Sequence, residues 1–214
     1  MAIVRGMIMT GMGQNVLLIT ADTYSKYINK NDRATSVLFG DGAAVTLISK
    51  SENDGIIDIS LASSGNEYES FYIPSGSRIP KSEVTKLEQT DNSGNIKTLE
   101  NIHMNGFAVW KFISKTVPEQ VNELLTKNNL GVNDISLFVF HQASMLTLDS
   151  LIKALKIDNS KVFINITNIG NTVSASIPIA LKDAENEGRL KRGDLVLLSG
   201  FGVGLSWGSL IMKY

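Results

Sequence analysis

The chain has 214 residues, of which 43% are hydrophobic and 19% are charged, as is ordinary for a globular protein with a substantial core. A formal net charge of -1 gives no field that would gather nucleic acid, so we expect no nucleic-acid partner. The absence of cysteine excludes disulfides, and with only two histidines we expect no metal site.

The first residues predict the latter part of a helix, not a signal peptide. Residues 2–10 end at Gly11 and Gly13, and they lack the basic start and the small-residue cleavage site of a secretory leader. A helix seldom begins a domain without a cap, so we expect the chain to be cut from something longer. No apolar run approaches the ~20 residues of a membrane helix, so we expect a cytoplasmic protein with no membrane partner.

The first quarter of the chain predicts short strands. Residues 16–20 are almost wholly apolar, which is typical of a strand covered on both faces. Residues 35–39 and 43–48 flank the tight turn Gly40-Asp41-Gly42, and this pattern predicts strand, turn and strand. The polar residues 51–55 form the best candidate boundary.

The remainder alternates between strands and helices. Residues 56–62 predict a strand, and 64–98 predict a long loop that is a lid, a partner contact or an insertion. Residues 104–128 have helical spacing, with Pro118 expected to bend or restart the helix. Further strands are predicted at 137–140, 162–166, 195–198 and 205–212, and further helices at 144–155 and 173–187. This alternation favours a layered α/β fold, with an antiparallel edge formed by the last two strands.

Two polar residues come at the ends of apolar segments. His141 follows an apolar strand, at the sheet edge where ligand sites of α/β proteins collect. Asn171 follows Gly170, at what we expect to be the equivalent point of the next strand-helix unit. A lone histidine in this place is more often structural, and an asparagine more often caps a helix. Together they favour a shared site, because both can donate hydrogen bonds to a carbonyl that becomes an oxyanion or enolate.

Three other segments have competing interpretations. Residues 40–44 (Gly-Asp-Gly-Ala-Ala) lack the spacing of a phosphate loop, so we interpret them as a turn with small packing residues. The glycines of 200–204 suit a bare turn or a pocket wall whose N–H groups serve as oxyanion donors. Lysines at 111, 115, 153 and 156 lie on helices beside the His141 strand, and such lysines usually form a solvated face unless an acidic carrier docks there.

Five motifs follow one another in a recognisable order. They are Phe39-Gly40-Asp41-Gly42-Ala43, Met104-Asn105-Gly106, His141-Gln142-Ala143, Gly170-Asn171-Thr172-x-Ser174-Ala175-Ser176-Ile177-Pro178 and Gly200-Phe201-Gly202-x-Gly204-x-Ser206-Trp207-Gly208. In this order they resemble the type III 3-oxoacyl-acyl carrier protein synthases over essentially the whole chain. The resemblance implies a thiolase-like fold of two α/β halves, each with a mixed five-stranded sheet, packed in five layers. Residues 1–50 would be the tail of the N-terminal half, and 55–214 the C-terminal half.

The resemblance also implies a reaction. In this family a cysteine takes an acyl group from acyl-CoA, and a decarboxylative Claisen condensation with malonyl-acyl carrier protein follows, in fatty acid biosynthesis and without a cofactor. The family's histidine and asparagine, which match His141 and Asn171, help the decarboxylation and stabilise the carbanion. The expected partners are acyl-CoA, the acyl carrier protein and a second copy of the full-length chain in a homodimer.

Further site residues follow from the same resemblance. The substrate-binding residues would be Phe201, Gly202, Gly204, Asn105 and Gly106, with Phe201 and the glycines after it at the pocket floor and entrance. The carrier protein would dock on Lys111 and Lys153.

Two departures from the family pattern alter these expectations. The family's cysteine begins the helix whose tail is residues 1–9, so here it would fall before Met1. Where members often carry a carrier-docking arginine, this chain has Leu146. We therefore expect the C-terminal part of a synthase that cannot condense acyl groups alone. The alternatives are a non-catalytic or split subunit beside a cysteine-bearing chain, or a related hydroxymethylglutaryl-type, polyketide or quinolone synthase.

Overall fold

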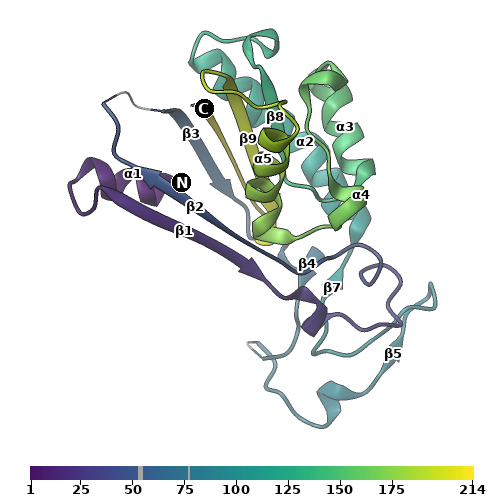
Figure 1. The fold of residues 1–214 in the computed structure, drawn as a ribbon. Helices are drawn as coiled ribbons and strands as arrows, with labels where there is room; N and C mark the ends of the chain where they lie inside the picture. The colour runs from purple at the N-terminus through teal and green to yellow at the C-terminus, as the bar shows by residue number, and fades with distance from the viewer. Residues whose placement is uncertain (53–54, 77) are drawn as a thin grey trace.

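Residues 1–52, 55–76 and 78–214 are described by the computed structural model, and their strands form one four-stranded sheet and three two-stranded sheets. The helices are α1 (Ala2–Met9), α2 (Gly106–Lys127), α3 (Met145–Leu155), α4 (Ile166–Ile169) and α5 (Ser176–Asn186) (Figure 1). The strands are β1 (Asn15–Asp22), β2 (Gly42–Ser49), β3 (Ile56–Ser63), β4 (Phe71–Tyr72), β5 (Gln89–Thr90), β6 (Ile96–Lys97), β7 (His103–Met104), β8 (Leu137–Phe140), β9 (Leu195–Gly202) and β10 (Ser206–Lys213). None of the helices in these described ranges is long and apolar enough to cross a membrane.

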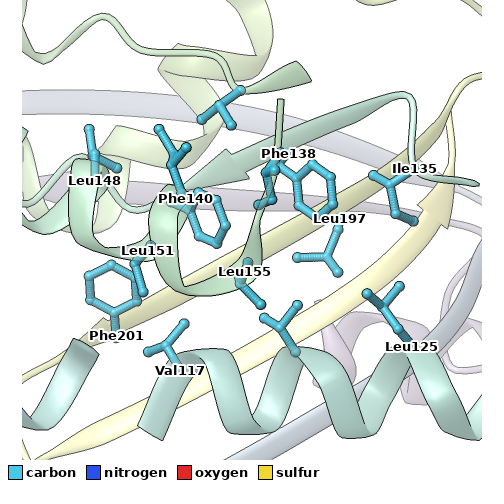
Figure 2. Packing of buried hydrophobic residues seen from close by; sticks show 14 of the residues in the cluster. Val117, Leu125, Ile135, Phe138, Phe140, Leu148, Leu151, Leu155, Leu197 and Phe201 are labelled. Atoms are coloured by element: carbon cyan, nitrogen blue, oxygen red, sulfur yellow. The ribbon is translucent and has the colours of Figure 1, made fainter. Parts of the chain in front are cut away.

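The larger sheet is mixed and carries helices on both faces. Its order is β3-β10-β9-β8, with β8 parallel to β9 and the other neighbours antiparallel. The strand β8 is buried throughout, and successive side chains of a strand point to opposite faces. Phe138 and Phe140 therefore pack against α2 and α3 (Figure 2), whereas Leu137 and Val139 pack against α5. The predicted layered α/β class is confirmed.

Most predicted elements of the C-terminal part are found where the pattern places them. Strand β3 and strand β8 match the predicted ranges, and helix α3 begins after the cap Ser144, whose hydroxyl oxygen accepts from the Thr147 N–H at 3.1 Å. Helix α2 continues through the buried Pro118, so the predicted restart is wrong. Its buried flank, which includes Val117 and Val121, packs on the sheet and offsets the lost backbone bond.

Residues 35–39 form turns, so the strand predicted there is wrong. The Asp32 carboxylate accepts a hydrogen bond from the Thr35 hydroxyl at 2.9 Å, and the Asp32 carbonyl accepts from the Thr35 N–H. These local bonds occupy groups that a strand ladder would need. Phe39 makes an isolated bridge to Asn171, and β2 pairs with β1 in place of the predicted partner.

The apolar strand β1 is covered on one face, whereas both faces were expected to be covered. One face of the β1–β2 ribbon lies toward α5 and the short 3₁₀ turn η6 (Val173–Ala175). Because side chains alternate, the other face points outward, and no described residue covers it. Its large side chains are 60–65% exposed: Leu17 60%, Ile19 65%, Val45 62% and Leu47 62%.

The strand predicted at 162–166 is reduced to a single bridge. Val162 bridges Phe138 beside β8, and the chain then turns into α4. The buried side chain of Gln142 accepts a hydrogen bond from the Asn165 N–H at 3.1 Å, which draws the backbone away from the ladder. In the described residues the largest sheet of this half therefore has four strands, with Val162 beside β8 at the fifth position.

Two further expectations are modified. The last two strands pair antiparallel as predicted, but β10 lies inside the sheet and β3 forms its edge. The described residues of 64–98 are mainly loop, as predicted, with the short strands β4, β5 and β6 and the 3₁₀ turns η2 (Tyr68–Ser70) and η3 (Val84–Lys86). The boundary at 51–55 stays a prediction, and residues 53 and 54 lie outside the described residues.

Candidate functional site

A cavity of about 310 Å³ opens where β8 and β9 end beside the loop that carries Asn171. Aromatic rings of Tyr24, Phe39 and Phe71 line it together with Phe201. The polar side chains of His141, Asn171 and Ser174 also reach it, and none of its described lining residues carries a formal charge. In such surroundings, hydrogen-bond donors stabilise a developing negative charge more strongly than they would in water.

His141 stands directly after β8, and several bonds hold it there. The backbone N–H of His141 donates to the Ser199 carbonyl of β9 at 2.8 Å. Its ring meets the Phe201 ring edge-on, with centroids 5.5 Å apart and planes at 77°. The Nδ1 atom lies 2.6 Å from the Ser176 hydroxyl oxygen. Burial lowers the pKa of His141 to about 4, so the imidazole is neutral near pH 7.

Asn171 is held by backbone and side-chain bonds together. Its N–H donates to the Leu38 carbonyl, and its carbonyl accepts from the Gly40 N–H, both at 2.9 Å. The side-chain Oδ1 accepts from the Val173 N–H at 3.0 Å, and Nδ2 donates to the Ala143 carbonyl at 3.4 Å. The amide is therefore oriented, and these bonds use one of its two N–H groups. Asn171 follows α4, so its predicted place after a strand is wrong.

Glycines allow the two segments around Asn171 to approach closely. A Cβ at Gly40 would lie 2.5 Å from the Ile169 carbonyl oxygen, and one at Gly42 would lie 2.8 Å from Thr172. Gly170 has φ +70°, and a Cβ there would meet the Leu38 carbonyl oxygen at 3.1 Å. Gly40 and Gly42 pack closely, as expected, but Asp41 and Ala43 are exposed and β2 begins at Gly42, so the predicted turn at residues 40–44 is wrong.

The structure brings four of the predicted site residues together. His141, Asn171, Phe201 and Gly202 all line the cavity. The segment 200–203 also lines a shallow, open hollow beside Trp207, and residues 200–202 belong to β9, so the segment is not a bare turn.

The other predicted residues lie outside the cavity lining. Gly204 falls in the turn between β9 and β10. Asn105 caps α2, with its side-chain oxygen accepting from the Ala108 N–H at 3.1 Å, and Gly106 is the first residue of that helix. Lys111 and Lys153 are exposed on α2 and α3, respectively.

Sequence reasoning missed two rings that line the cavity and one residue, Ser176, that contacts His141. Tyr24 and Phe71 come from distant segments, and no spacing pattern connects them with His141. Ser176 was part of a quoted motif, but no role was assigned to it. A buried polar residue at a helix start, five positions after the candidate Asn171, is the signal that could have indicated it.

Comparison with known proteins identifies the fold and the family. The family model for 3-oxoacyl-[acyl-carrier-protein] synthase III matches residues 1–65, and the model for its C-terminal part matches residues 125–214. A beta-ketoacyl-[acyl-carrier-protein] synthase III of Clostridium perfringens is 39% identical over 98% of this chain and 62% of its own length. The chain therefore spans about three fifths of the length of the curated relatives that it matches.

Solved structures agree with these matches. A crystal structure of a 3-oxoacyl-(acyl-carrier-protein) synthase III has a TM-score of 0.97 and 36% identity over all of this chain and 64% of its own. The priming beta-ketosynthase of the R1128 polyketide pathway has a TM-score of 0.84 and 27% identity over 99% of this chain and 60% of its own. The predicted thiolase-like fold class is confirmed. Since both family models describe parts of one kind of protein, this chain belongs to the 3-oxoacyl-[acyl-carrier-protein] synthase III family.

Proposed function

We propose that His141 and Asn171 are the carbanion-stabilising half of a condensing site that joins an acyl group from acyl-CoA to malonyl-acyl carrier protein. One observation carries the proposal: a neutral imidazole and an oriented amide line the same cavity, whose described lining has no formal charge. Two neutral N–H donors can bind a negative oxygen without transferring a proton to it.

The proposed chemistry has two steps. In the first, the bond between the malonyl carboxylate and its α-carbon breaks, carbon dioxide leaves, and the electron pair spreads onto the thioester oxygen. That oxygen would accept hydrogen bonds from His141 and Asn171. In the second, the α-carbon forms a bond with an acyl group held as a thioester on cysteine, and the cysteine sulfur leaves as thiolate.

The nucleophilic sulfur is not supplied by these 214 residues, which contain no cysteine. We therefore propose that the chain by itself forms no 3-ketoacyl product. A direct test joins it to the segment of the Clostridium perfringens relative that precedes the matched region and supplies acetyl-CoA and malonyl-acyl carrier protein. We expect product from the joined protein and none from the chain alone, whereas product from the chain alone would overturn this proposal.

Lys111 and Lys153 are proposed to dock the carrier protein beside the cavity. Both are exposed on helices joined by a hydrogen bond of 2.9 Å from the Trp110 indole N–H to the Ser150 hydroxyl. In the joined protein, K111E and K153E should raise KM for malonyl-acyl carrier protein several-fold and leave KM for acetyl-CoA unchanged. The matched control K191E should change neither value.

The remaining parts of the proposal rest on the family pattern. Phe201 and Gly202 are proposed to contact the substrate in the cavity, and Gly204, Asn105 and Gly106 are assigned as substrate-binding by motif alone. A homodimer of the full-length protein and a cytoplasmic location belong to the same proposal.

A second candidate is a polyketide-priming synthase, favoured by the similarity to the R1128 enzyme. Comparing acyl carrier proteins of the two pathways as acceptors in the joined protein distinguishes the candidates.

A further inference from the structure

The buried hydroxyl of Ser176 contacts the His141 ring at Nδ1. Ser176 is the first residue of α5 and is fully buried, and its Oγ lies 2.6 Å from His141 Nδ1. We propose that Ser176 is a positioning residue that fixes His141 in the tautomer protonated at Nε2. The imidazole then presents an N–H, and not a lone pair, to a bound ligand.

The hydrogen-bond donors and acceptors at Ser176 favour this tautomer. A serine hydroxyl has one proton to donate and two lone pairs that accept. One lone pair accepts from the Gln142 N–H at 3.4 Å. In the part of the chain that the structure describes, the acceptor within reach of the hydroxyl proton is His141 Nδ1.

The opposite tautomer leaves a buried group unsatisfied. If Nδ1 carried the proton, it would donate to Ser176 Oγ, and the hydroxyl proton would lose its acceptor in a fully buried place. Leaving a buried donor unpaired is disfavoured enough to exclude most of that population, by about tenfold or more. The Nε2–H form satisfies every group at this contact.

Hydrogen bonds to neighbouring residues thus orient both candidate donors. Contacts with Val173 and Ala143 orient the Asn171 amide and use one of its two N–H groups. The contact with Ser176 leaves Nε2–H as the available group of His141. That these donors act on a thioester oxygen rests on the proposed function, whereas the tautomer itself does not.

The chain offers an internal reference for measuring the tautomer. It contains two histidines, and Nε2 of the other one, His103, lies 2.9 Å from the Thr98 carbonyl oxygen. A carbonyl only accepts, so neutral His103 is also protonated at Nε2. Long-range ¹H–¹⁵N correlation spectra of the full chain with ¹⁵N-labelled histidine, taken near pH 7.5, should show the same pattern for both rings.

Two variants test the cause of the preference. In S176A, the His141 excess of Nε2–H over Nδ1–H should fall at least several-fold, while the His103 pattern stays unchanged. S176T retains the hydroxyl and should restore the wild-type pattern. The control S150A removes a hydroxyl that contacts Trp110 and should alter neither histidine.

Each outcome decides the inference. An Nδ1–H pattern for His141 in the wild-type chain would overturn it without any variant, and so would an unchanged His141 pattern in folded S176A. The readout needs no activity, so it is separable from the proposed function. A confirmed tautomer with full condensation by a joined protein lacking the His141 imidazole would leave this inference standing and refute the proposed role of the histidine.

Discussion

At the scale of single residues, the proposed chemistry requires an uncharged His141. Burial lowers its pKa from the ordinary 6.5 to about 4, so the folded chain resists protonation in a range where the unfolded chain accepts it. A charged imidazole would no longer have a free Nδ1 to accept from Ser176. Between about pH 6.5 and pH 4 the unfolded state therefore binds more protons.

The stability of the chain should accordingly fall with pH in that window. Above pH 6.5 His141 is neutral in both the folded and the unfolded chain, so stability is highest there. As the pH falls toward 4, the free energy of unfolding decreases by up to about 1.4 kcal/mol per pH unit, because the unfolded chain binds a proton that the folded chain does not. Urea unfolding at pH 7 and pH 5 should show a smaller loss in H141Q than in the wild type. The control L151A opens a cavity in the core without removing a titrating group, so its pH dependence should match the wild type. Equal pH dependence of H141Q and wild type would contradict this account.

At the scale of elements, the cavity depends on the contact between residues 38–42 and the loop after α4. Two backbone bonds join Asn171 to Leu38 and Gly40, and glycine at 40 permits the approach to Ile169. This pairing joins the β1–β2 part of the chain to the part that carries His141. It therefore fixes the position of one candidate donor relative to the other.

Adding a methyl group at Gly40 should loosen that contact. In G40A the new Cβ would lie 2.5 Å from the Ile169 carbonyl oxygen, which is part of the backbone and cannot rotate away. We expect a loss of about 1–3 kcal/mol in thermal or urea unfolding. In the control G6A, the new Cβ on helix α1 meets nothing within 4 Å, so the variant should be as stable as the wild type or slightly more stable. Equal stability of G40A and wild type would show that the segments are not held this closely.

Local patterns predicted some elements of this fold well and others poorly. Strand β8 and helix α3 were predicted because their apolar spacing and the cap Ser144 act locally. Residues 35–39 and 162–166 have strand-like composition, but side chains of Asp32 and Gln142 divert their backbones. Such hydrogen bonds give no periodic signal in the sequence. In the case of Gln142, the bonded N–H lies 23 residues further along the chain.

Sequence patterns likewise predicted only part of the candidate site. The motifs placed His141, Asn171, Phe201 and Gly202, and the cavity contains all four. Sequence spacing could not show that the Ser176 hydroxyl faces the His141 ring, because the two residues are 35 positions apart. It also could not show which motif residues lie away from the cavity, as Asn105 does when it caps α2.

At the scale of the whole molecule, one face of the β1–β2 ribbon is apolar and open. Leu17, Ile19, Val45 and Leu47 are each at least 60% exposed on the same face. Contiguous exposed apolar surface of this kind marks an association site or promotes aggregation. The exposed Met9 and Met12 of the neighbouring α1 region add further apolar surface.

We expect the isolated chain to self-associate through this face. Light scattering should show a mass that rises with concentration. The double variant L17K/V45K should reduce the rise, because the two ammonium groups would lose hydration when a second copy covers this face. The control V84K changes an exposed valine in the 64–98 loop and should leave association unchanged. A monodisperse monomer of the wild-type chain at high concentration would contradict this expectation.

We propose that His141 and Asn171 act on the carbanion, and not on the step that loads cysteine. The most direct measurement follows the two half-reactions separately in the protein joined to the cysteine-bearing segment, by mass spectrometry of the acyl-enzyme and by single-turnover condensation with malonyl-acyl carrier protein. For N171A we predict normal acylation of cysteine and a condensation rate lowered by about 10²–10³. Normal condensation by N171A, or an equal loss of both half-reactions, would contradict the account.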